Sequence, residues 1–165
     1  MENKIGIYVF SRDTIKDFVT DLPHIFISIR EPDTKGYINK PLEIPYNQNL
    51  VARLDLDFCD MDCRKSKPEH LTDLGYKLFS VEDAKSIIKF INLTKNYIKL
   101  IIVQCPGGIS RSYGVAAALS KLMYDEDQLF FDKGHPNMYV YRTILNVAQD
   151  MKPIGEENEA EIIKS

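Results

Sequence analysis

Two side chains that can do chemistry lie close together in the sequence. Cys105 is followed, after five intervening residues, by Arg111. A cysteine thiolate is a strong nucleophile, and the planar guanidinium of arginine matches two oxygens of a phosphate group. The intervening residues include Gly107 and Gly108, which allow backbone N–H groups to approach an oxyanion closely. A nucleophile and an anion cradle within one loop predict attack on phosphorus.

The elements around this loop must bring the two side chains together. Leu100 to Val103 is an unbroken apolar run, which predicts a buried strand that ends next to Cys105. The small-residue run from Gly114 to Leu119 predicts a helix that begins near Arg111. The free N–H groups and the positive dipole end of such a helix favour a bound anion and the thiolate form of Cys105. This position also lies outside the carboxyl end of a strand, where α/β sheets bind ligands.

The residues Cys105-Pro106-Gly107-Gly108-Ile109-Ser110-Arg111-Ser112 resemble the Cys-x5-Arg-Ser/Thr loop of cysteine-dependent protein tyrosine and dual-specificity phosphatases. The whole chain is also similar to small predicted tyrosine-phosphatase-like proteins of bacteria and phages, whose loop matches Gly108-Ile109-Ser110-Arg111-Ser112. One position departs from the pattern, because Gln104 precedes the cysteine where the classical members usually have histidine.

The resemblance implies hydrolysis of phosphotyrosine or a related phosphate monoester through a phosphocysteine intermediate. Cys105 would be the nucleophile, and the Ser112 hydroxyl would donate a hydrogen bond to its sulfur and ease departure of the thiolate. Arg111 and the loop N–H groups would hold the phosphate oxygens. The phosphate-binding residues implied are Pro106, Gly107, Gly108, Ile109, Ser110 and Arg111. This chemistry requires neither a metal ion nor an organic cofactor, so we expect none.

Phosphoryl transfer to a thiolate also requires an acid that protonates the leaving oxygen. In the resembling families this acid is an aspartate on a loop that follows another strand, upstream of the cysteine. Asp60 lies just past the end of the predicted strand over residues 50–58 and is the first candidate. Asp62 is the second candidate. Asp73, at a separation from Cys105 like that in compact dual-specificity phosphatases, is the third.

Other interpretations of Cys105 are open at this point. A single buried cysteine after a strand is usually a small hydrophobic residue. A sulfurtransferase also uses a thiolate in an anion-binding loop, but the Arg111-Ser112 pair at this spacing argues against it. An inactive module of the same fold would bind phosphate or a phosphoprotein without hydrolysing it, and Gln104 is compatible with that alternative.

Length and composition limit the possible partners. The 165 residues, 44% hydrophobic and 27% charged, predict one globular domain over residues 1–152 and a charged tail over 153–165. The net charge of −3 offers no basic surface for nucleic acid. No apolar run approaches the ~20 residues of a membrane span, and the N-terminus has no signal-peptide pattern. We therefore expect a phosphorylated protein or a small phosphate monoester as partner, with neither nucleic acid nor a membrane; the oligomeric state stays open.

The three cysteines indicate the redox setting. Cys59, Cys63 and Cys105 are an odd number and do not form a disulfide framework, which favours a reducing, cytoplasmic location. Cys59 and Cys63 with the nearby His70 are poorly spaced for zinc, so we predict no metal site. If the loop that carries the acid folds over Cys105, Cys59 or Cys63 could resolve an oxidised Cys105; we favour two cysteines buried as apolar residues.

Predicted strands and helices alternate along the chain. The apolar patterns predict strands over residues 5–10, 25–29, 50–58 and 98–103, and helices over 12–22, 81–91, 111–123 and from Asn137 onward. Proline and glycine residues predict a long loop over residues 31–48. Unbroken apolar strands separated by helices predict a single α/β domain, with a mainly parallel central sheet flanked by helices on both faces.

Overall fold

The structure is a computed structural model that describes residues 4–63, 67–151 and 154. Its elements are, in chain order, β1 (Gly6–Phe10), the 3-10 helix η1 (Thr14–Asp17), β2 (His24–Arg30), β3 (Leu50–Asp57), α1 (Pro68–Asp73), α2 (Val81–Thr94), the 3-10 helix η2 (Lys95–Tyr97), β4 (Leu100–Gln104), α3 (Arg111–Tyr124), α4 (Gln128–Lys133) and α5 (Met138–Asp150). The α/β class predicted from the sequence is confirmed.

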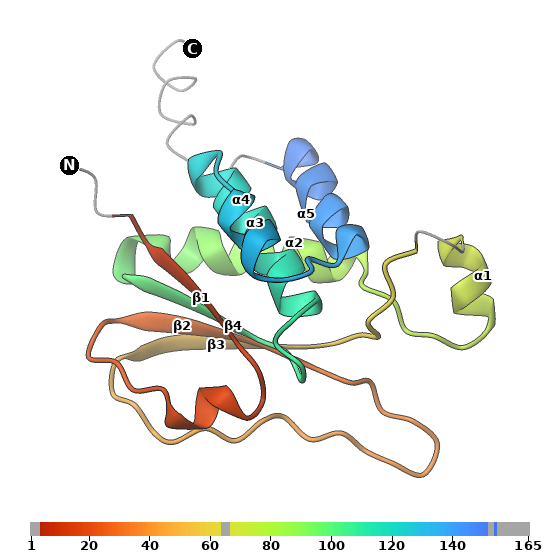
Figure 1. Ribbon diagram of the computed structural model, residues 1–165, viewed down its shortest axis with the longest axis horizontal. Coiled ribbons are helices and arrows are strands. Elements are labelled where there is room, and N and C mark those ends of the chain that lie inside the picture. Colours follow the sequence, from red (N-terminus) through yellow and green to blue (C-terminus); the bar gives the residue numbers. More distant parts are fainter. Residues whose placement is uncertain (1–3, 64–66, 152–153, 155–165) are drawn as a thin grey trace.

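The four strands form one sheet in the order β1-β4-β2-β3, and every neighbouring pair is parallel (Figure 1). The two central strands, β2 and β4, are buried along nearly their whole length, which explains why their sequences are apolar without alternation. Gln104 in β4 pairs with Phe10 in β1 and with Ser28 in β2. The carboxyl ends of these strands therefore lie level with one another, and the residues that follow them meet at one edge of the sheet.

The main core lies between the sheet and three helices. Figure 1 shows α2, α3, α4 and α5 on one side of the sheet. Side chains of β2 and β4 pack there against α2, α3 and α5; the fully buried members include Ile25, Ile27, Ile101, Ile88 and Ile144. The other face carries a smaller cluster of Ile15, Phe26 and Ile102, covered by η1 and by Leu42 and Ile44. Helices were predicted on both faces, but the second face has only the short η1 and an irregular segment.

The helix predicted over residues 12–22 was wrong. Only Thr14–Asp17 is helical, as one 3-10 turn. Ile15 reaches the core, whereas Val19 is 80% exposed and Leu22 is 48% exposed. A short helix depends on packing of its apolar face, and in this stretch Val19 and Leu22 do not pack into the core.

Two predicted helix starts are confirmed in detail. Ser80 and Asp83 form a reciprocal capping box at the start of α2, and the Asn137 side chain accepts a hydrogen bond from Val140 N at the start of α5. The predicted tail over residues 153–165 lies outside the described residues, except that Ile154 is buried in the main core. Among the described residues, no helix has the length and apolar character needed to cross a membrane.

Candidate active site

The loop between β4 and α3 forms a tight turn around the sulfur of Cys105. Gly108 has a φ of +62°, a conformation that side chains disfavour. A Cβ atom there would lie 2.6 Å from Ser11 N, so the loop passes directly over the end of β1. Further backbone hydrogen bonds fix the loop to its surroundings, from Arg12 N to Pro106 O and from His135 N to Ile109 O. The loop is therefore held in one conformation by segments distant in sequence.

Two groups contact the Cys105 sulfur. Ser112 Oγ lies 3.0 Å from Sγ, and Gly108 N–H donates to Sγ at 3.2 Å. The Cys105 residue is only 2% exposed and packs at the edge of the main core. This arrangement places the Cys105 sulfur at the base of the loop, with the predicted contact to Ser112 present.

The Arg111 guanidinium is buried and held from two sides. Its Nη1 donates to Phe58 O at 2.9 Å, and its Nη2 pairs with Glu31 Oε1 at 2.6 Å. The third nitrogen, Nε, is buried and has no hydrogen-bond partner among the described residues. A buried cationic N–H without an acceptor is costly. The arginine is thus pre-oriented, and its Nε–H lacks an acceptor among the described residues.

Ser110 stands at the N-terminal end of α3 but does not cap that helix. Its hydroxyl donates instead to Asp60 Oδ1 at 2.8 Å. The N–H groups of the first turn of α3 are therefore not satisfied by the Ser110 side chain, and such groups bind anions.

The structure brings Asp60 to the loop. Asp60 Oδ1 accepts hydrogen bonds from Ser110 Oγ and, at 2.9 Å, from Asn137 Nδ2. Both of these hydrogen bonds end on Oδ1. The Asp60 residue is exposed. Asp60 therefore contacts the loop directly, through Ser110.

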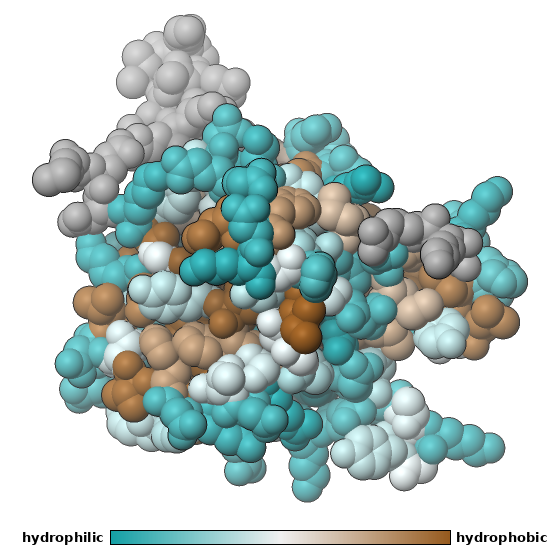
Figure 2. Space-filling view, viewed as in Figure 1, coloured by the Kyte–Doolittle hydropathy of each residue, from teal (hydrophilic) through white to brown (hydrophobic). Residues whose placement is uncertain are grey.

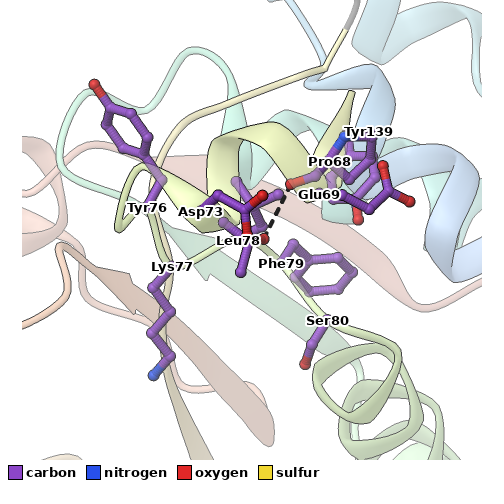
Figure 3. Close-up of a pocket in the computed structure, with 10 residues that line it drawn as sticks. Pro68, Glu69, Asp73, Tyr76, Lys77, Leu78, Phe79, Ser80 and Tyr139 are labelled. Atoms are coloured by element: carbon purple, nitrogen blue, oxygen red, sulfur yellow. Dashed lines mark hydrogen bonds between the residues drawn. The ribbon is translucent and has the colours of Figure 1, made fainter. Parts of the chain in front are cut away.

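Asp73, the third candidate, lies elsewhere in the structure. Asp73 ends α1 and lines a separate pocket of about 560 Å³ together with Tyr139. Figure 3 shows Asp73 among the residues that line this pocket, which include Glu69 and Phe79. Asp62 lies near Cys63: burial raises the pKa of the Cys63 thiol, and the Asp62 carboxylate raises it further. Among the described residues, Asp73 makes no hydrogen bond to the loop, so its role as the acid loses support.

Gln104 stands at the position where the classical phosphatases usually have histidine, and its side chain makes a buried hydrogen bond. Its Oε1 accepts a hydrogen bond from Ser28 Oγ at 2.7 Å, and both residues are buried. The amide therefore joins the two central strands immediately before Cys105. It has a structural partner of its own and brings no positive charge to the sulfur.

Three residues of the site were not found by sequence reasoning. Glu31 and Phe58 hold Arg111, and Asn137 holds Asp60 while it also caps α5. Asn137 was predicted only as a cap. Glu31 lies in an irregular stretch with no periodic pattern, and Phe58 acts through its backbone carbonyl, which no sequence pattern marks. The one available signal was position, because Glu31 and Phe58 directly follow β2 and β3.

The remaining cysteines give no sign of a redox partner. All three cysteines are free. The raised pKa of Cys63 disfavours the thiolate that a resolving cysteine needs. Within the described ranges, no group of three or more His, Cys, Asp or Glu side chains gathers where it could hold a metal ion.

Comparison with known proteins supports the fold. No protein-family model and no curated protein sequence matches the chain. Among solved structures, the human tyrosine phosphatase-like serine/threonine/tyrosine-interacting protein is similar with a TM-score of 0.54 and 16% identity, over 90% of this chain and 95% of that chain. PTPMT1, solved in complex with PI(5)P, has a TM-score of 0.52 and 11% identity, over 91% of this chain and 97% of that chain.

The chain has the protein tyrosine and dual-specificity phosphatase fold. The sequence resemblance implied a parallel sheet with the Cys105–Arg111 loop between a strand and a helix. The structure has this arrangement, with the loop between β4 and α3. At identities of 16% and 11% the likeness establishes the fold, and the chemistry must be argued from the site itself.

Proposed function

We propose that the protein is a cysteine-dependent phosphatase that hydrolyses phosphotyrosine or a related phosphate monoester. The observation that carries the proposal is the state of Arg111. Its guanidinium is buried and fixed by Phe58 and Glu31, while Nε has no acceptor among the described residues. A phosphate held above Cys105 by the loop N–H groups would supply that acceptor.

The first step transfers the phosphoryl group to sulfur. The Cys105 thiolate attacks phosphorus in line, the S–P bond forms, and the bond from phosphorus to the ester oxygen breaks. Arg111 and the N–H groups of residues 106–111 stabilise the charge on the equatorial oxygens. The Asp60 carboxyl gives its proton to the departing oxygen, and the product alcohol or phenol leaves.

The second step releases phosphate. Water attacks the phosphocysteine, and the Asp60 carboxylate accepts a proton from it. The S–P bond breaks and the sulfur leaves as a thiolate. The Ser112 hydroxyl, 3.0 Å from Sγ, stabilises that leaving thiolate by a hydrogen bond. The cycle regenerates both groups, and it works in a reducing compartment such as the cytoplasm because Cys105 must stay a free thiol.

The test is hydrolysis of p-nitrophenyl phosphate with a chelator present and vanadate as competitor. We expect metal-independent activity that vanadate inhibits, that Cys105→Ser abolishes and that Arg111→Lys largely removes, since a point charge cannot replace the planar fork. Cys63→Ser is the matched control and keeps its activity. A well-folded protein without activity that still binds vanadate would overturn the proposal in favour of a phosphate-binding module, and sulfur transfer to cyanide would indicate a sulfurtransferase.

A further inference from the structure

A groove of about 840 Å³ lies between the segment that follows β2 and the segment that follows α1. One wall is formed by residues 31–39 and the other by residues 74–77, with Asp57 and Cys59 between them. Figure 2 shows a hollow at the right of the molecule between two projecting parts, which Figure 1 identifies as the segment after β2 and the region of α1. Because Glu31 lines the groove and pairs with Arg111, the groove begins at the candidate phosphate site.

The first wall presents an aromatic side chain on a fixed turn. Thr34 and Tyr37 exchange two backbone hydrogen bonds, each of 2.9 Å, and Asn39 N donates to Asp33 Oδ1 at 2.8 Å. The Tyr37 side chain at this turn is 62% exposed. A rigidly held and exposed tyrosine loses little conformational freedom on binding, which makes it a good contact for a partner.

The second wall has the same character. It follows α1, and hydrogen bonds from Tyr76 N to Leu71 O and from Gly75 N to Thr72 O fix its backbone. Leu74 is 62% exposed and Tyr76 is 44% exposed. Large apolar side chains thus stand on both sides of the groove, as they do where proteins bind a peptide or another apolar partner.

The charges of the groove select the occupant. Glu31, Asp33 and Asp57 supply three carboxylates, against the single ammonium group of Lys77. Glu31 pairs with Arg111, and Asp57 pairs with Lys77 at 2.8 Å. Asp33 has no ion pair within the described part of the chain. The groove therefore attracts a cationic group near Asp33 and repels a second phosphate.

We propose that this groove binds the segment that flanks the phosphorylated residue of a protein substrate, and that it favours basic residues in that segment. The proposal rests on the proposed phosphatase function and names its substrate class. The apolar walls contact the peptide chain, and Asp33 provides the preference for lysine or arginine. A lipid headgroup that carries several phosphates is disfavoured by the same carboxylates.

The test compares three phosphotyrosine nonapeptides in which the residues on both sides of phosphotyrosine are lysine, alanine or glutamate. We expect kcat/KM to fall from the lysine to the alanine to the glutamate peptide by about two- to fivefold at each step. The difference shrinks at high salt, because exposed charges are screened. Equal values for the three peptides, or a higher kcat/KM for a phosphoinositide in vesicles than for any peptide, would overturn the proposal.

Matched variants identify the groups responsible. Tyr37→Ala lowers kcat/KM for the peptides about tenfold more than it lowers the value for p-nitrophenyl phosphate, which has no flanking chain. Its control is Tyr46→Ala, because Tyr46 is 92% exposed and does not line the groove. Asp33→Asn keeps the acceptor for Asn39 N and reduces the discrimination between the lysine and glutamate peptides. The control Asp21→Asn removes an exposed charge that does not line the groove and leaves this discrimination unchanged.

A binding experiment separates the two proposals. Fluorescence anisotropy of the labelled peptides with Cys105→Ser measures the affinity without turnover. If the wild type does not hydrolyse p-nitrophenyl phosphate but the peptides still bind in the order lysine, alanine, glutamate, the catalytic proposal fails and the groove proposal holds. If hydrolysis of p-nitrophenyl phosphate occurs and Tyr37→Ala affects all substrates equally, the groove proposal alone fails.

Discussion

Substitution of Gly108 by alanine tests the conformation of the Cys105–Arg111 loop. Alanine substitutions at Gly36 and Gly107 serve as comparisons, because Gly36 has a positive φ without a close contact and Gly107 has neither. Gly108 has a φ of +62°, and an added Cβ would lie 2.6 Å from Ser11 N and 2.8 Å from Ser11 Cα. Gly36 has a φ of +83° with no atom within 4 Å of an added Cβ, and Gly107 would meet only Ile109 Cδ1 at 4.0 Å. The set therefore separates backbone strain from steric contact.

The expected free energies follow from these contacts. Alanine in the left-handed region costs about 1–2 kcal/mol, and a contact with fixed backbone adds about 1–3 kcal/mol. In the unfolded chain, alanine in place of glycine returns about 0.4–1 kcal/mol. Gly108→Ala should thus destabilise the protein by about 2–4 kcal/mol, Gly36→Ala by about 0–1.5 kcal/mol, and Gly107→Ala should be neutral or slightly stabilising.

Urea unfolding followed by circular dichroism measures these differences, and thermal unfolding gives a second measurement. For a domain of this size, 2–4 kcal/mol corresponds to a fall in Tm of roughly 4–16 °C for Gly108→Ala. Vanadate binding should be lost in the same variant, since the Gly108 N–H that donates to Cys105 Sγ must move. Gly108→Ala with the stability of Gly107→Ala would refute the described loop conformation.

Three further predictions concern single contacts. Asp60→Asn keeps the acceptor for Ser110, and it should lower kcat about 100-fold for phenyl phosphate but less than tenfold for p-nitrophenyl phosphate; equal losses would exclude Asp60 as the acid. Ser112→Ala should slow phosphocysteine breakdown about 10- to 100-fold and so produce a burst of product in rapid-mixing experiments; a linear time course would contradict this role. Burial and the hydrogen bond to Asp127 raise the pKa of Tyr141 to about 12. The stability that this shift contributes is complete below pH 10 and is lost as the pH rises towards 12, so urea unfolding should show a steeper loss over that interval for the wild type than for Tyr141→Phe; parallel curves would refute it.

Strong local patterns made much of the fold predictable. The apolar strands β2 and β4 are buried on both faces, and the capping box of Ser80 and Asp83 marks the start of α2. The helix predicted over residues 12–22 failed because its pattern is local, whereas its stability depends on contacts with the sheet. Ile15 makes such contacts, but Val19 points to solvent. A periodic pattern therefore identifies a helix only where a partner surface exists.

The site was predictable where its residues are adjacent in sequence. Cys105, Arg111 and Ser112 lie within one short segment of the sequence, so their spacing alone indicates the chemistry. The supporting contacts could not be predicted, because they join residues far apart. Glu31 pairs with Arg111 across 80 positions, and Asn137 donates to Asp60 across 77 positions. Such contacts depend on which loops the parallel sheet brings to its carboxyl edge.

The most direct test of the central claim is the identity of the covalent intermediate. Acid quenching of the enzyme during turnover of a ³²P-labelled phosphotyrosine peptide, followed by peptide mapping, shows where the phosphate resides. We expect label on the peptide that contains Cys105, more label in Ser112→Ala, and none in Cys105→Ser. Hydrolysis without a labelled Cys105 peptide, or label on another residue, would contradict the central claim.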